Sequence, residues 1–247
     1  MSASGNERAC DVVVVGGGVL GTAIAARLAA TTARVCLVEA AADVADGASK
    51  GNAGIATSYY GDPASLETRL IVESTPGWER LAERLDVPYR RSGGLVVALT
   101  AEEEARLPAL RDDAEACGAR AELLDGREAR ALEPLAAEGC RAAVHLPDEG
   151  LVDPMRLTVA YARLAAANRC AVLRGTPVTG VVVEDGAIAG VLTPAGTIRA
   201  RFVVNAAGLG AGRPRGRPAG TRPCAATCAG PRPRRARRCG RRRGRRR

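Results

Sequence analysis

Four consecutive valines, Val12 to Val15, lead directly into a glycine-rich turn, and this junction constrains the fold more than any other feature of the chain. An uninterrupted run of β-branched residues is typical of a strand buried on both faces, as in a parallel sheet. Gly16, Gly18 and Gly21 follow with G-x-G-x-x-G spacing, and the stretch from Thr22 to Ala30 has a helical pattern. The sequence therefore predicts an α/β fold that begins with a βαβ unit.

The spacing of these glycines indicates a dinucleotide site. Gly16 permits the tight turn, Gly18 lets the backbone approach a pyrophosphate, and Gly21 lets the helix pack close to the strand. The N-terminus of the helix adds free N–H groups and the positive end of its dipole. Glu39 closes a second strand, Arg34 to Val38, 18 residues beyond Gly21. A carboxylate there can accept hydrogen bonds from both hydroxyls of an adenosine ribose. The alternative is an ordinary strand-to-helix turn without a ligand.

Caps, chain breakers and hydrophobic periodicity predict the elements that follow. Pro76-Gly77 should divide one helical stretch in two, and Pro108 should kink another or delay its start. In chain order we expect a helical stretch at 65–86, a strand at 89–99 with a glycine step at Gly93-Gly94, a helix capped by Thr100 and Glu103 that runs to about Cys117, a short helix capped by Asp125 and Glu128, a strand at 141–146, a helix at 154–167, and a β-meander at 177–184, 187–193 and 197–205.

The net charge of +9 averages two different parts of the chain. Residues 211–247 contain 15 Arg and no acidic residue, which leaves a net charge of −6 for residues 1–210. We therefore do not expect the body of the protein to bind nucleic acid. Arg, Pro, Gly, Ala and Cys dominate residues 211–247, and such a segment cannot bury enough apolar surface to become ordered. We expect it to be a disordered basic tail.

Two origins for this tail remain open. It could be a genuine nucleic-acid-binding tail, since arginines bind phosphates electrostatically, although it contains no aromatic residue for stacking. The interpretation that we favour is a slip of the reading frame near residue 210, because GC-rich DNA read out of frame yields this composition. A corrected frame should then restore helix and strand periodicity.

The cysteine and histidine content argues against a metal site. The chain has eight cysteines, no C-x-x-C pair and one histidine, so we expect no structural zinc. Met1 to Cys10 is short and polar, without the apolar region of a secretory signal, and no apolar run is long enough to span a membrane. A cytoplasmic location is the default expectation.

Several segments together resemble the FAD-dependent oxidoreductases of the D-amino-acid oxidase superfamily, over about residues 10–210. These segments are the G-x-G-x-x-G opening, Ser49-x-x-Asn52-Ala53-Gly54, the β-meander, and the ending Val203 to Gly208. Segments 59–66, 92–98 and 149–154 are most similar to the branch with glycerol-3-phosphate dehydrogenases and L-2-hydroxyglutarate oxidases. The Asn-Ala-Gly element is also similar to D-amino-acid dehydrogenases.

The resemblance implies a Rossmann-like FAD-binding domain with a parallel sheet and a β-meander, at 10–56 and 146–210. It also implies an inserted α+β substrate domain at 57–145. FAD would be the cofactor. The implied contacts are Gly16, Gly18 and Gly21 on the pyrophosphate, Glu39 on the adenosine ribose, Ser49 near the pyrophosphate, Asn52, Ala53 and Gly54 along the flavin, the backbone of Val178 on adenine, and Ala207 and Gly208 on the phosphate–ribitol portion.

The implied reaction is oxidation of a CH–OH group of a small molecule, a 2-hydroxy acid or a glycerol-3-phosphate-like substrate, by hydride transfer to flavin N5. Oxidation of a CH–NH₂ group is the first alternative. A non-catalytic nucleotide-binding module with a basic tail is the second. Because the resembled family needs more chain after residue 210, we expect the chain as written to bind FAD weakly or not at all and to show no turnover.

No catalytic residue is assigned from the sequence, and the electron acceptor stays open. His145 is the only histidine and could act as a base, but a lone histidine on a strand is more often structural. An arginine would normally hold the carboxylate or phosphate of the substrate. Arg69, Arg90 and Arg91 are candidates for that role, and each could equally be a solvated surface charge.

Overall fold

A computed structural model describes residues 8–212. These residues lie within one of the two units of the chain, Met1–Gly216. Almost all of the predicted basic tail, from residue 213 onward, lies outside the described residues. In the part of the chain that the structure describes, no helix has the length and apolar character needed to cross a membrane.

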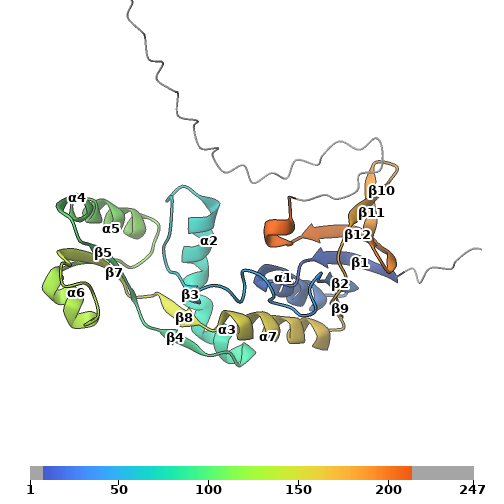
Figure 1. Cartoon of the computed structure of the whole chain (residues 1–247), viewed down its shortest axis with the longest axis horizontal. Helices are drawn as coiled ribbons and strands as arrows, with labels where there is room; N and C mark the ends of the chain where they lie inside the picture. The colour runs from blue at the N-terminus through green and yellow to red at the C-terminus, as the bar shows by residue number, and fades with distance from the viewer. Residues whose placement is uncertain (1–7, 213–247) are drawn as a thin grey trace, which may run out of the picture. The chain divides into compact units, whose positions relative to one another are not determined.

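The largest sheet has six strands in the order β10-β11-β12-β1-β2-β9 (Figure 1). Strand β1 pairs in parallel with both β2 and β12, and β2 pairs in parallel with β9. Strands β10, β11 and β12 form the antiparallel meander that the sequence predicts. The strands are β1 (Arg8–Val15), β2 (Val35–Val38), β9 (Ala171–Leu173), β10 (Gly180–Glu184), β11 (Ala187–Thr193) and β12 (Gly196–Asn205). This is the predicted α/β class with a Rossmann-like sheet.

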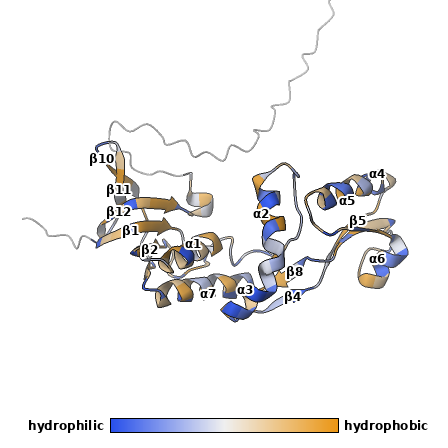
Figure 2. Ribbon diagram, turned by 180° about the vertical axis from the view of Figure 1, so that it is seen from behind, coloured by the Kyte–Doolittle hydropathy of each residue, from blue (hydrophilic) through white to orange (hydrophobic). Residues whose placement is uncertain are grey.

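Both faces of the central strands are buried, as the valine run indicates. One face of β1 and β2 packs against α1 (Val19–Ala29) and α7 (Pro154–Ala167) through small side chains such as Ala26 and Ala165. The opposite face packs against the beginning of β12 and against β11, where Val191 is buried. Figure 2 shows β1 and β12 largely in hydrophobic colours, in contrast with the hydrophilic α3 (Trp78–Leu85).

A second, three-stranded sheet has the order β3-β8-β4. Its strands are β3 (Ile55–Ala56), β8 (Gly150–Val152) and β4 (Tyr89–Arg91). The helices α2 (Leu66–Ser74) and α3 lie between β3 and β4 in the chain, and a 3₁₀ turn at Thr75–Gly77 separates them. The predicted division at Pro76-Gly77 is therefore confirmed. Tyr89 stacks on Trp78 with ring centroids 5.9 Å apart, which joins β4 to α3.

The third sheet has the order β5-β7-β6 and is antiparallel throughout. Its strands are β5 (Gly94–Ala98), β7 (Ala142–Leu146) and β6 (Glu122–Asp125). One face packs against α5 (Leu107–Ala116), and Ala143 on the other packs with Ala129 of α6 (Gly126–Leu132). The predicted capping boxes at Thr100 and Asp125 are both present, at the start of α4 (Ala101–Glu104) and of α6.

One sequence prediction needs correction, and for a second the structure decides between two alternatives. The strand at 89–99 is not one strand with a glycine step: the chain turns at Gly93 (φ +70°), so that β4 and β5 belong to different sheets. The helix after Thr100 is interrupted at Ala105-Arg106 and resumes with Pro108 in its first turn, which is the delayed start that Pro108 indicates. The sequence does not predict the short strands β3, β6, β8 and β9, since two to four residues carry too little periodicity.

The predicted domain boundaries remain a proposal. Strands β3 and β8 fall just outside the segment 57–145, yet both belong to the sheet that contains β4 from inside it. This sheet therefore joins the segment 57–145 to the chain on either side of it.

Candidate cofactor site

Three parallel strands end side by side at one edge of the six-stranded sheet. Val15 of β1 is in register with Val38 of β2 and with Asn205 of β12. The residues that follow them, at 16–18, 39 and 206–208, therefore meet at the carboxyl edge of the sheet. In open α/β sheets this edge is where ligands bind.

Two glycines of the turn are required by the packing of the chain itself. Gly16 has φ +110°, and a Cβ there would overlap the carbonyl of Ala206. A Cβ on Gly21 would overlap the carbonyl oxygen of Gly16. Gly16 therefore lets β12 approach the turn, and Gly21 lets α1 pack directly on it, which is the role that the sequence predicts for Gly21.

Gly18 has a different environment. A Cβ built on Gly18 would have only one neighbour within 4 Å, the Ser49 hydroxyl at 3.1 Å, and the backbone has φ −73°. Neither the backbone conformation nor crowding by the main chain requires a glycine here. The space beside Gly18 is therefore suited to a group from outside the chain, and a pyrophosphate at the N-terminus of α1 fits it.

Glu39 is held against the same turn. Its carboxylate accepts hydrogen bonds from the N–H groups of Gly17 at 2.5 Å and of Ala41 at 2.7 Å. A carboxylate has about four acceptor positions, so two remain for the hydroxyls of a ribose. The structure thus places Glu39 beside the glycine turn and leaves it able to accept further hydrogen bonds.

The loop after Glu39 returns to the N-terminus of α1. The N–H of Ala45 donates to the carbonyl of Gly17 at 2.9 Å, and the N–H of Val19 donates to the Ser49 hydroxyl at 2.9 Å. Ser49 thereby occupies a capping position that Gly18 cannot fill with a side chain. The structure brings Ser49 together with the glycine turn, in agreement with its predicted position near the pyrophosphate.

Asn52, Ala53 and Gly54 lie further along this loop and do not meet the glycine turn. The Asn52 carboxamide bonds to the carbonyl of Ala48 and to the N–H of Gly54, and it stays exposed with Ala53. Gly54 has φ +72°, and a Cβ there would overlap the carbonyl oxygen of Val152. This glycine therefore packs on β8 and directs the chain into β3.

Ala207 and Gly208 follow β12 at the same edge as the turn. The N–H of Ala206 donates to the carbonyl of Val15 at 2.8 Å, and the Asn205 carboxamide accepts from the N–H of Ala207 at 3.3 Å. Gly208 has φ +53° and begins a short 3₁₀ turn, Gly208–Gly210. Both predicted residues are thus next to the carboxyl end of β1.

Val178 follows a segment that pairs with the chain around Glu39. The N–H of Thr176 donates to the carbonyl of Glu39 at 2.8 Å, and the N–H of Gly175 donates to that of Ala41 at 2.7 Å. Val178 follows this pairing, half-buried against the face of the sheet that includes Val38. Strand β10 begins at Gly180, so Val178 precedes the meander rather than opening it.

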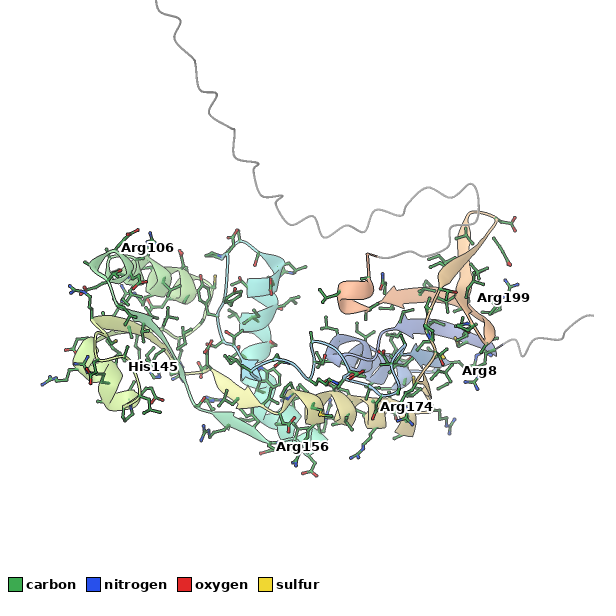
Figure 3. All side chains as sticks on the ribbon, viewed as in Figure 1. Arg8, Arg106, His145, Arg156, Arg174 and Arg199 are labelled. Atoms are coloured by element: carbon green, nitrogen blue, oxygen red, sulfur yellow. The ribbon has the colours of Figure 1, made fainter. Side chains whose placement is uncertain are left out.

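Some contributors to this edge carry no signal that sequence reasoning could use. Gly17 supplies the N–H that binds Glu39. Ala45 is fully buried with φ +65°, an uncommon conformation for a residue other than glycine. Arg174 pairs with Asp43 at 3.2 Å across the edge, and Figure 3 labels Arg174. The pKa of Asp43 lies below its ordinary value because the carboxylate accepts from the N–H of Val44 and from Arg174.

The structure separates the other candidates from this edge. His145 lies on β7, with its side chain 20% exposed and its Nδ1 3.4 Å from a carboxylate oxygen of Glu122 (Figure 3). This position in the β5-β7-β6 sheet supports a structural role. Within residues 8–212, no three His, Cys, Asp or Glu side chains are grouped as metal ligands would be.

One cavity lies at the opposite edge of the six-stranded sheet. Its volume is about 560 Å³, and its lining includes Arg8, Cys10 and Arg34 at the amino ends of β1 and β2. It contains none of the residues of the glycine turn. We therefore assign the candidate cofactor site to the carboxyl edge, on the geometry of the turn.

Comparison with known proteins agrees with this geometry. The family model described as "FAD dependent oxidoreductase" matches residues 11–233. The match extends beyond residue 210, and the reading-frame slip predicted there remains a prediction.

Two curated relatives have different named substrates. The chain is 34% identical to 4-methylaminobutanoate oxidase (formaldehyde-forming) of Paenarthrobacter nicotinovorans, over 80% of this chain and 24% of that protein. It is 27% identical to the glycerol 3-phosphate dehydrogenase of Caloramator mitchellensis, over 81% of this chain and 42% of that protein. The chain thus spans less than half the length of these two relatives.

Among solved structures, the chain is similar to the L-α-glycerophosphate oxidase of Mycoplasma pneumoniae with FAD bound. The TM-score is 0.70 and the identity 25%, over 79% of this chain and 52% of that one. The glycine turn at a Rossmann-like edge, the fold and the family match agree with one another. The chain belongs to the family of FAD dependent oxidoreductases.

Proposed function

We propose that residues 8–212 hold the FAD of an oxidoreductase that oxidises a CH–OH group of a small molecule. Gly18 and the N-terminus of α1 would receive the pyrophosphate, and Glu39 the adenosine ribose. The observation that carries this proposal is the open space beside Gly18. The packing of the chain itself does not require a glycine at this position. Ser49, Val178, Ala207 and Gly208 would add contacts at the same edge, while Asn52, Ala53 and Gly54 would lie along the flavin.

When bound, FAD supplies the redox chemistry by accepting a hydride at N5. The residues of this chain have to bind and orient the cofactor and to present a substrate carbon to it. Similarity to a glycerol 3-phosphate dehydrogenase supports a CH–OH substrate. Similarity to a methylaminobutanoate oxidase supports the second candidate, oxidation at a carbon that bears nitrogen.

The cofactor assignment is tested by titrating the purified 247-residue chain with FAD and following flavin fluorescence. Gly18→Val should abolish binding, because its side chain would fill the space for the pyrophosphate, while the circular dichroism spectrum stays unchanged. Gly139→Val is the matched control, since Gly139 is exposed and a Cβ there meets nothing within 4 Å. Equal FAD affinity in Gly18→Val and the unaltered chain would remove this turn from the site.

Two further measurements test cofactor identity and activity. Cofactor released by heat should be FAD by chromatography, and a nicotinamide alone would overturn the proposal. Glycerol 3-phosphate, L-2-hydroxyglutarate and glycine are then added to the FAD-loaded chain, and bleaching of the flavin absorbance by one of them identifies the substrate class.

For the chain as written, we expect weak FAD binding and no bleaching of the flavin. For the protein obtained after the gene is resequenced and the frame is corrected near codon 210, we expect bleaching. Bleaching by glycine alone would replace the CH–OH assignment by the second candidate. Absence of bleaching in the corrected protein would favour the non-catalytic module.

A further inference from the structure

The sequence gives Arg69, Arg90 and Arg91 as equal candidates for binding the anionic group of a substrate. The structure distinguishes them by their ion-pair partners. Arg69 pairs with Glu73 on α2 at 3.7 Å. Arg91 pairs with Glu79 at 3.2 Å and with Asp148 at 3.1 Å. Arg90 is exposed, and among residues 8–212 it makes neither an ion pair nor a side-chain hydrogen bond. Arg90 is therefore the one of these three whose guanidinium is available to an anion from outside the chain.

Arg90 lies on the open face of the β3-β8-β4 sheet. Leu151 at its centre is in register with Ile55 on one side and with Arg90 on the other. Register partners share a face, so these three side chains form a row across the sheet. Ile55 is 59% exposed and Leu151 39% exposed.

The other face of this sheet is packed. Ala56 is buried there, and the ring of Tyr89 lies against Gly150 so closely that a Cβ on Gly150 would overlap it. The stacking of Tyr89 on Trp78 covers this face further. The row of Ile55, Leu151 and Arg90 is thus the side of the sheet that the chain leaves open.

This row begins where the proposed flavin contacts end. Ile55 directly follows Gly54, the last residue of the segment proposed to lie along the flavin. Neighbouring strands are about 4.8 Å apart, so Arg90 lies about 10 Å across the sheet from Ile55. Two apolar side chains beside an unpaired guanidinium suit a small organic molecule with one anionic end.

We infer that Arg90 binds the anionic group, a carboxylate or a phosphate, of the substrate, and that Ile55 and Leu151 contact its carbon atoms. This inference rests on the proposed function. A guanidinium presents parallel N–H donors to two oxygens of a carboxylate or phosphate, which fixes the orientation of the bound molecule as well as its affinity. Arg90 would then determine which end of the substrate faces away from the flavin.

The test uses the 247-residue chain saturated with FAD and follows the shift of the absorption bands of the oxidised flavin as an anion binds, a readout that does not require turnover. The three probes are L-2-hydroxyglutarate, glycerol 3-phosphate and glycine, each at constant ionic strength. Arg90→Met should raise the half-saturating concentration of the preferred probe at least about tenfold, because a charge-assisted pair is lost. Arg90→Lys should recover part of the affinity, since it keeps the charge without the paired donors.

The matched control is Arg69→Met, which removes an exposed arginine that is already paired with Glu73. It should titrate like the unaltered chain, and all variants should bind FAD equally. The probe that gives the larger response distinguishes a carboxylate from a phosphate substrate.

The possible failures are distinguishable. One outcome is that Arg90→Met and the unaltered chain have the same FAD affinity and the same half-saturating anion concentration. This outcome would overturn the role of Arg90 and leave the proposed function standing. The same conclusion follows if FAD binds and no probe changes its spectrum. Absence of FAD binding both in the chain as written and after the frame correction near codon 210 would instead overturn the proposed cofactor site, and the inference about Arg90 with it.

Discussion

The six-stranded sheet and the two three-stranded sheets are stabilised in different ways. In the six-stranded sheet, all four residues of β2 are buried and Leu37 is fully inaccessible. In the β5-β7-β6 sheet, outward residues such as Val96 and Leu123 are about 40% exposed. The first sheet depends on apolar burial from both faces.

The smaller sheets depend more on local polar contacts. The capping boxes at Thr100 and Asp125 begin helices that pack beside the β5-β7-β6 sheet. Asp148, between β7 and β8, binds Arg91 of β4 and also Arg120, which precedes β6. The carboxylate of Asp148 thus links the two small sheets, and the same kind of substitution should have different consequences in the two regions.

The largest effect is expected from Gly21→Val, at the contact between α1 and the turn. The new side chain would overlap the carbonyl oxygen of Gly16, which cannot move without displacing β1. We expect a loss of at least about 4 kcal/mol in the free energy of unfolding, which for a marginally stable protein means failure to fold. Gly139→Val, in open space outside the six-stranded sheet, should unfold in urea like the unaltered chain. Normal folding of Gly21→Val would contradict the close packing of helix and strand.

A pair of leucine truncations should reproduce the contrast between the regions. Leu37→Ala opens a cavity in the core of the six-stranded sheet and should cost about 2–5 kcal/mol. Leu123→Ala removes a side chain that is 40% exposed and should cost less than about 1 kcal/mol. The urea midpoints of the two variants measure the difference. Similar midpoints would show that both regions depend on burial alike.

The smallest effect is expected from Asp148→Asn, and it should depend on pH. Arg120 binds both oxygens of Asp148 at 2.7 Å and, by this hydrogen bonding, holds the pKa of Asp148 below its ordinary value. A carboxylate with a lowered pKa in the folded state stabilises the protein above the pKa of the unfolded chain and loses this effect at lower pH.

We therefore expect Asp148→Asn to lower the free energy of unfolding by up to about 1 kcal/mol at neutral pH, the order typical of pairs that solvent screens. The difference from the unaltered chain should disappear as the pH falls from about 4 through the lower pKa of folded Asp148. Urea unfolding at neutral and acidic pH measures it. A difference that grows on acidification would have the wrong sign for this ion-pair network.

Much of the nucleotide-binding fold could be predicted from local sequence. The valine run, the glycine spacing and the helical pattern of 154–167 act within one strand, one turn or one helix, and the corresponding elements β1, α1 and α7 are confirmed. The family resemblance is confirmed as well. The assignments of individual cofactor contacts stay predictions, although the structure brings Glu39 and Ser49 to the glycine turn.

Relations between distant segments were decided only by the tertiary structure. The sequence does not distinguish Gly16, Gly18 and Gly21. In the structure, the carbonyl of Ala206 leaves no room for a Cβ on Gly16, and the carbonyl of Gly16 leaves none on Gly21, whereas the space beside Gly18 is open. Arg90 and Arg91 are neighbours in β4, yet alternation along the strand places Arg90 with Leu151 on the open face, while Arg91 pairs with Glu79 and Asp148. Local patterns determine which residues enter a strand or a helix, because backbone geometry repeats over a few residues. Which atoms then crowd a glycine or neutralise an arginine depends on segments far apart in the chain, and only packing brings those together.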